Sequence, residues 1–156
     1  MVTRIGVIGR DGEIPEKIKD ICEQIGAEIA KKDCILICGG RTGVMEAACR
    51  GAKKAGGVTV GILQSTDKNE ANQYVDIPIT TGMGKIRNAL VVISSDVLIA
   101  INGRTGTLSE IAIALNHGKP VVMVNGTSCV GEPLKDPNLF FADAKDAVGV
   151  ALDLVK

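Results

Sequence analysis

Aromatic side chains are nearly absent from this sequence: its 156 residues include two phenylalanines, one tyrosine and no tryptophan. Proteins that hold single-stranded nucleic acid usually stack the bases on aromatic rings along a basic groove. The 18 basic and 18 acidic residues cancel to a formal net charge of zero, so a basic groove is not indicated either. We therefore expect no nucleic-acid partner.

Long apolar runs are missing as well. No stretch approaches the length of a membrane span, and the N-terminus lacks the pattern of a secretory leader. His117 is the only histidine, and the five cysteines form no Cys-x-x-Cys pair. These absences predict a cytoplasmic protein without membrane contact, metal site or other resident cofactor. Most cysteines are expected to be small core residues, with Cys129 the most exposed, and His117 is expected to contact the last carbonyls of a helix.

Apolar runs alternate with helical periodicity along the whole chain. Strands are predicted at residues 4–8, 34–38, 59–63, 75–79, 97–101 and 121–124, and helices at about 15–29, 42–55, 85–94, 105–117 and 143–152. Residues 64–73 and 125–136 are predicted to be loops. This alternation indicates an α/β fold with a doubly wound, mainly parallel sheet, and the length suits one domain spanning residues 1–156.

The word Gly-Arg-Thr-Gly occurs twice, at residues 40–43 and 103–106. Each copy follows a buried-type strand and precedes a helix, and each helix is followed by another strand. Two such units place their turns at the carboxyl edge of a parallel sheet, where they are predicted to face one crevice from two sides. The alternative is that any parallel sheet needs glycine turns, in which case the repeat carries no function.

The second copy has the features of a phosphate site. Gly103 and Gly106 are able to adopt a positive φ and to bring the backbone close to a ligand, and the first turn of a helix leaves N–H groups free. Thr105 or Thr107 is predicted to cap the helix or to bond a phosphate oxygen. Glu110 lies one helical turn beyond Thr107 and is predicted to face the same crevice.

Two common nucleotide sites do not fit the glycine pattern. The first turn, with Gly6, Gly9 and Gly12, lacks the Gly-x-Gly-x-x-Gly spacing of dinucleotide sites, and no Walker lysine follows either Gly-Arg-Thr-Gly turn. With these two kinds of site set aside, the glycine turns are expected to recognise phosphate through backbone N–H and hydroxyl groups. Lys85 and Arg87 lie at the start of a predicted helix, where cations are disfavoured unless an anion lies nearby, so they too suggest an anionic ligand. The alternative is a solvated basic surface.

Three ordered motifs resemble those of the LOG-like Rossmann proteins. Residues 39–47, Gly-Gly-Arg-Thr-Gly-Val-Met-Glu-Ala, resemble the first motif, Arg87-Asn88 the second, and residues 106–110, Gly-Thr-Leu-Ser-Glu, the third. The resemblance covers about residues 4–124. It is strongest to the short branch that includes molybdenum cofactor carrier proteins, which has a glutamate at position 46 where plant LOG enzymes have glycine.

The resemblance implies a three-layer Rossmann-like fold, a homodimer or larger homo-oligomer, and a small phosphorylated ligand, either a nucleoside monophosphate or a pterin-type cofactor. In the enzymes, the residues matching Arg87 and Glu110 serve hydrolysis of an N-glycosidic bond, which releases a base and ribose 5-phosphate. The implied ligand-binding residues are Gly9, Gly40, Thr42, Gly43, Met83, Gly103, Arg104, Thr105, Gly106 and Thr107.

One departure from the family pattern bears on the ligand. The third motif of the enzymes begins Pro-Gly-Gly, whereas this chain has Asn102, Gly103 and Arg104. Arg104 either adds a phosphate contact or obstructs the turn. Two functions therefore stay open: a nucleoside 5′-monophosphate phosphoribohydrolase, and a carrier or sensor that binds a pterin-type cofactor or nucleotide without turnover.

Overall fold

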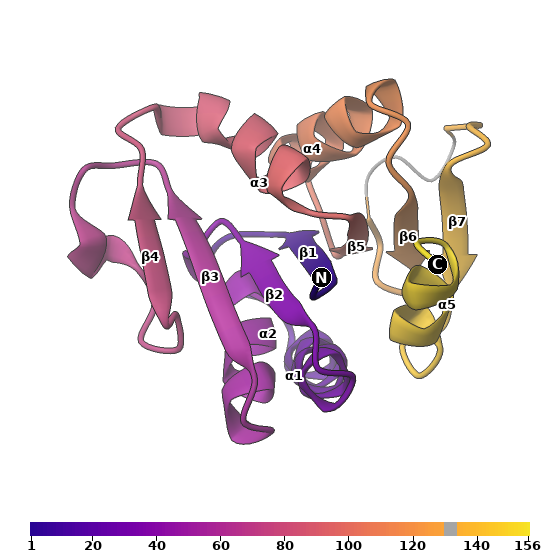
Figure 1. Ribbon diagram of the computed structural model, residues 1–156, viewed down its shortest axis with the longest axis horizontal. Helices are drawn as coiled ribbons and strands as arrows, with labels where there is room; N and C mark the ends of the chain where they lie inside the picture. Colours follow the sequence, from indigo (N-terminus) through magenta and orange to yellow (C-terminus); the bar gives the residue numbers. More distant parts are fainter. Residues whose placement is uncertain (130–133) are drawn as a thin grey trace.

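The computed structural model describes residues 1–129 and 134–156 (Figure 1). Within them, seven strands form one sheet of order β4-β3-β2-β1-β5-β6-β7, and every neighbouring pair is parallel. The strands are β1 (Arg4–Gly9), β2 (Ile35–Cys38), β3 (Val58–Leu63), β4 (Ile77–Thr80), β5 (Val97–Ile101), β6 (Val121–Val124) and β7 (Leu139–Ala142). The helices are α1 (Glu16–Lys31), α2 (Val44–Lys54), α3 (Asn88–Ser94), α4 (Thr105–Asn116) and α5 (Ala147–Asp153), with 3₁₀ turns η1 (Lys68–Glu70) and η2 (Gly84–Arg87).

Helices cover both faces of the sheet, so the fold has three layers (Figure 1). Buried side chains of α1, α2 and α5 form one core against the sheet, and those of α3 and α4 form a second core on the other face. The inner strand β5 is buried at all five positions, as expected for a parallel strand covered on both faces. The predicted doubly wound, Rossmann-like α/β fold is confirmed.

Helices α1 and α2 approach each other closely because each contributes a glycine to the contact. A Cβ atom at Gly26 would lie 1.9 Å from the carbonyl oxygen of Ala48, and one at Gly51 would lie 2.0 Å from that of Glu23. Real Cβ atoms are not found at such distances from backbone atoms, so this contact excludes any larger residue.

Several sequence predictions need correction. The sheet has a seventh strand, β7, which the sequence analysis missed, and the helix predicted from residue 85 begins as the 3₁₀ turn η2. Cys129 is 5% exposed, so it is buried and not the most exposed cysteine. The predicted contact of His117 is confirmed, with its Nδ1 2.9 Å from the carbonyl oxygen of Ile113. Part of the loop predicted at 125–136 lies outside the described residues.

Four isoleucines remain exposed on the side of the sheet that faces α3 and α4. Ile77 and Ile79 of the edge strand β4 are 49% and 45% exposed, and Ile86 and Ile93 are 70% and 50% exposed. Helix α3 has only seven residues and packs over β1 and β2, so it leaves β4 uncovered. We call these four residues the exposed isoleucines. In the described part of the chain, no helix has the length and apolarity to cross a bilayer.

Candidate functional site

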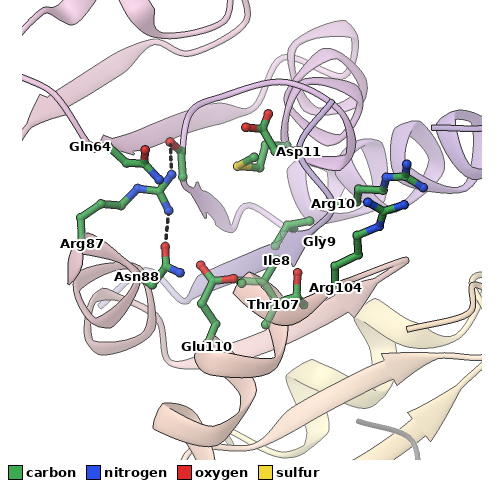
Figure 2. A pocket seen from close by; sticks show the side chains of 14 residues that line it. Ile8, Gly9, Arg10, Asp11, Gln64, Arg87, Asn88, Arg104, Thr107 and Glu110 are labelled. Atoms are coloured by element: carbon green, nitrogen blue, oxygen red, sulfur yellow. Dashed lines mark hydrogen bonds between the residues drawn. The ribbon is translucent and has the colours of Figure 1, made fainter. Parts of the chain in front are cut away.

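The central strand β1 marks the point where the order of strands reverses. From β1 the chain adds β2, β3 and β4 toward one edge and then returns to place β5 on the other side of β1. In open α/β sheets, ligands bind at the carboxyl ends of the strands at such a point. A cavity of about 240 Å³ lies there, and residues that follow β1, β2, β3 and β5 contribute to its lining (Figure 2). We call it the switch-point pocket.

Arg87 is a buried cation in the wall of this pocket. The residue is only 4% exposed. Its Nη1 donates to Asn88 Oδ1 at 2.6 Å, and its Nη2 donates to the carbonyl oxygen of Gly39 at 3.4 Å. The buried Nε has no hydrogen-bond partner among the described residues. A Cβ at Gly39 would lie 2.7 Å from Nη2, so the glycine makes room for the guanidinium group. Burial lowers the pKa of Arg87, and the nearby charge of Glu110 opposes this shift.

Glu110 projects into the pocket from α4, at the same end as Arg87 (Figure 2). The residue is 6% exposed, yet within the described chain its carboxyl group forms neither a hydrogen bond nor an ion pair. Burial raises the pKa of Glu110 to about 8, and the positive charge of Arg87 only partly offsets this effect. A buried carboxyl group without partners is costly, and such groups are enriched where a protein binds or transforms a ligand.

A chain of side chains connects Arg87 to the start of α4. Asn88 accepts from Arg87 and donates through Nδ2 to Ser109 Oγ at 3.3 Å. Ser109 in turn donates to the carbonyl oxygen of Gly106 at 2.6 Å. The second and third family motifs are therefore held together by the fold, although they are far apart in the sequence.

Helix α4 begins in the pocket without a side-chain cap. Arg104 is the residue that precedes its first turn, and neither Thr105 nor Thr107 caps the helix. The N–H groups of this turn have no partner within the helix and carry the positive end of its dipole. Gly103 and Gly106 do not adopt a positive φ, contrary to our expectation; instead Asn102 does, at +44°.

The first Gly-Arg-Thr-Gly turn has a structural role. Gly40 and Gly43 have φ values of +74° and +64°. The carboxylate of Asp11 holds the turn by accepting a hydrogen bond from Thr42 Oγ1 at 2.6 Å and by forming an ion pair with Arg41, with Nε at 2.9 Å. Burial opposes ionisation of Asp11, but the hydrogen bond from Thr42 and the charge of Arg41 together lower the pKa of this carboxyl below its ordinary value. The polar side chains of this Gly-Arg-Thr-Gly turn therefore contact the protein itself.

The structure brings together half of the residues predicted for the site. Those that line the switch-point pocket are Gly9, Arg87, Arg104, Gly106, Thr107 and Glu110. Those that do not line it are Gly40, Thr42, Gly43, Met83, Gly103 and Thr105. Thr42 and Gly43 border a neighbouring cavity of about 370 Å³, and Met83 is 44% exposed.

Four polar residues of the pocket lining were not predicted as site residues from the sequence: Arg10, Asp11, Gln64 and Asn88. Arg10 and Asp11 directly follow β1, and Gln64 directly follows β3. Their position after a parallel strand was a usable signal, because the carboxyl ends of all strands meet at one edge of the sheet.

The whole chain is similar to solved structures of proteins that bind the molybdenum cofactor. The molybdenum cofactor binding protein from the phototrophic bacterium Rippkaea orientalis superposes with a TM-score of 0.92 at 35% identity, over 100% of this chain and 99% of that one. The molybdenum cofactor carrier protein from Chlamydomonas reinhardtii gives a TM-score of 0.88 at 35% identity, over 99% and 98% of the two chains.

Two sequence relatives are similar over most of the chain. An uncharacterized protein from Archaeoglobus fulgidus is 50% identical over 118 residues, which are 76% of this chain and 77% of that protein. A cytokinin riboside 5′-monophosphate phosphoribohydrolase from Mycobacterium tuberculosis is 30% identical over 118 residues, which are 70% of this chain and 63% of the enzyme. The model of the SLOG cluster4 family matches residues 2–150. The chain therefore belongs to the SLOG cluster4 family, a LOG-like group with structures close to the molybdenum cofactor carriers.

Proposed function

We propose that the switch-point pocket binds a nucleoside 5′-monophosphate or a closely similar compound and hydrolyses its N-glycosidic bond. The observation that carries this proposal is the buried carboxyl group of Glu110, which has no hydrogen-bond partner among the described residues and lies at the same end of the pocket as Arg87. The likeness to a phosphoribohydrolase supports the reaction class. In this proposal the first turn of α4 binds the 5′-phosphate through free N–H groups.

The chemistry follows from the charge that develops on the sugar. Cleavage of an N-glycosidic bond passes through a state with oxocarbenium character, and an ionised carboxylate stabilises that charge and orients or deprotonates the attacking water. Glu110 serves this role in its ionised form, whose share increases as the pH rises toward the pKa of about 8. Arg87, held by Asn88 and the backbone, keeps Glu110 more acidic than burial alone would make it, and its planar guanidinium offers two-point contact to an anion.

The test is release of ribose 5-phosphate from AMP, GMP, CMP, UMP and IMP. We expect wild type to act on at least one of them, Glu110→Gln to lose at least about 100-fold in rate, and Glu110→Gln to keep its affinity within about tenfold. Glu70→Gln, which alters an exposed carboxylate of η1, serves as the matched control and should match wild type. Unchanged turnover in Glu110→Gln would remove the catalytic role.

A second candidate function is a carrier for a pterin-type molybdenum cofactor. It is supported by the likeness to molybdenum cofactor binding proteins, which extends over the full chain at 35% identity. If the protein is a carrier, its switch-point pocket would hold the phosphate of the cofactor at the start of α4, and Glu110 would serve as a neutral hydrogen-bond donor. An absorbance spectrum, molybdenum analysis and mass spectrometry of freshly purified protein test this function: bound pterin with no ribose 5-phosphate release supports it over hydrolysis.

We further propose that the protein is a homodimer or larger homo-oligomer in which a second copy covers the exposed isoleucines. Isolated apolar side chains are common on surfaces, but four large ones on one side of a sheet are typical of a contact face. Arg87 and Asn88 of the pocket lie on the same segment as Ile86 and Ile93, so the contact would lie close to the site.

A further inference from the structure

Two of the six arginines have no partner among the residues that the structure describes. Arg4, Arg41 and Arg50 form ion pairs with Asp96, Asp11 and Glu23, and Arg87 is held by Asn88 and the Gly39 carbonyl. Within the described residues, Arg10 and Arg104 form neither a hydrogen bond nor an ion pair.

The two unpaired arginines both line the switch-point pocket. Arg10 directly follows β1 and Arg104 follows β5, and the ends of these adjacent strands are paired in register at Gly9 and Ile101. Figure 2 draws the two guanidinium groups at one end of the pocket, with Arg87 and Glu110 at the other end. The fold therefore gathers two cations on one side of a cavity that already contains the free N-terminus of α4.

Like charges that share a small site repel each other. The two carboxylates of the pocket lining, Asp11 and Glu110, do not pair with Arg10 or Arg104 and so do not offset this repulsion. Asp11 is engaged by Arg41 and Thr42, and Glu110 lies across the pocket beside Arg87. A phosphomonoester carries close to two negative charges at neutral pH and offers three acceptor oxygens, which suits two guanidinium groups. A phosphodiester carries one charge and has fewer free oxygens.

We propose that Arg10 and Arg104 form a clamp for a terminal phosphate, so that the pocket selects a phosphomonoester over the corresponding phosphodiester and over the unphosphorylated compound. This proposal rests on the proposed function, because it names the end of the pocket that holds the phosphate of that ligand. It also assigns a role to Arg104, which stands where the LOG-like pattern has a glycine. In the clamp, the charges of two arginine side chains bind the phosphate in place of the close contact between ligand and backbone that a glycine allows.

The test compares binding of AMP, ribose 5-phosphate, 3′,5′-cyclic AMP and adenosine by calorimetry. These probes share ribose but differ in the charge of the phosphate and in the presence of the base. We expect wild type to bind AMP at least tenfold more tightly than cyclic AMP. Arg10→Ala and Arg104→Ala should each weaken AMP and ribose 5-phosphate at least tenfold and leave adenosine within twofold, while Arg104→Lys should recover part of the loss.

Lys17→Ala is the control, because it removes an exposed cation of α1 outside the pocket and should leave all four affinities within twofold. Circular dichroism verifies that each variant is folded. If both arginine variants bind AMP like wild type, the clamp is wrong and the proposed function stands. If ribose 5-phosphate binds through both arginines but no nucleotide is bound or cleaved, the clamp stands and the proposed function fails. If wild type binds neither phosphomonoester, both are wrong.

Discussion

Glu110 is the residue in which function and stability conflict most directly. Its carboxyl group is removed from water and accepts no hydrogen bond from any residue that the structure describes, and burial raises its pKa from 4.5 to about 8. The folded state therefore binds a proton between these two pH values that the unfolded state does not. Stability from this group is complete below about pH 4.5 and is lost as the pH rises through about 8.

This conflict predicts a pH-dependent effect of Glu110→Gln. Above pH 8 the wild-type protein must bury an ionised carboxylate, whereas glutamine has the same shape and no charge. We expect the variant to be about 1–3 kcal/mol more stable than wild type at pH 8.5, with a difference that shrinks toward pH 5. Urea unfolding at the two pH values measures this, and an equal difference at both would contradict the raised pKa.

Asn102 explains why this chain departs from the Pro-Gly-Gly pattern. It has a φ of +44°, its N–H donates to Thr127 Oγ1 at 3.1 Å, and its Nδ2 donates to the Thr127 carbonyl at 2.7 Å. Proline fixes φ near −65° and has no N–H. The proline of the LOG-like enzymes is therefore incompatible with the observed backbone at position 102.

We expect Asn102→Pro to lower the free energy of unfolding by more than about 3 kcal/mol. Asn102→Gly accepts the same φ and keeps the backbone donor, so it should cost only about 1 kcal/mol for the one side-chain hydrogen bond that it loses. Urea denaturation of both variants makes the comparison. Equal stability of the two would show that the turn has a second, proline-compatible conformation.

Helices and strands with strong periodicity were predictable from the sequence. The apolar runs of β1, β2, β3, β5 and β6 lie within a residue of their predicted bounds, because strands buried on both faces need uninterrupted apolar residues. Strand β7 was missed because it is short, lies at an edge and is only partly buried, so no pattern separates it from the preceding loop. In the site, the repeated Gly-Arg-Thr-Gly sequence suggested two ligand-binding turns. The two turns differ in backbone conformation, and Asp11 binds only the first of them.

The contact between α1 and α2 depends on residues that carry no chemistry. We expect Gly51→Ala to cost more than about 2 kcal/mol, because its Cβ would overlap the carbonyl oxygen of Glu23 and backbone atoms cannot easily move away. Gly149→Ala in α5 is the matched control: no atom lies within 4 Å of the added Cβ, so alanine should add about 0.5–1 kcal/mol of stability. Thermal unfolding distinguishes the two. A Gly51→Ala variant as stable as the control would show that the helices can separate without cost.

At the scale of the whole molecule, the helices of the described chain leave the exposed isoleucines uncovered. We expect Ile79→Lys and Ile86→Glu each to convert the proposed oligomer into a monomer, because either places an unpaired charge in the contact. Phe141→Lys changes a side chain that is 49% exposed on the opposite edge strand, β7, and should leave the assembly intact. Light scattering gives the mass of each variant, and a monomeric wild type would contradict the proposed contact.

The two Gly-Arg-Thr-Gly turns are expected to tolerate substitution of their glycines differently as homologous sequences diverge. Gly40 and Gly43 are required by positive φ, and a Cβ at Gly43 would lie 2.2 Å from the carbonyl oxygen of Arg10, so drift cannot remove them without damage to the fold. Gly106 has no such requirement, since a Cβ there would meet no protein atom within 4 Å. A descendant that no longer binds its ligand is thus free to lose Gly106 but must keep Gly40 and Gly43. Under the proposed function, in which a phosphate lies against the first turn of α4, the residue at position 106 in diverging lineages would therefore report whether ligand binding is retained.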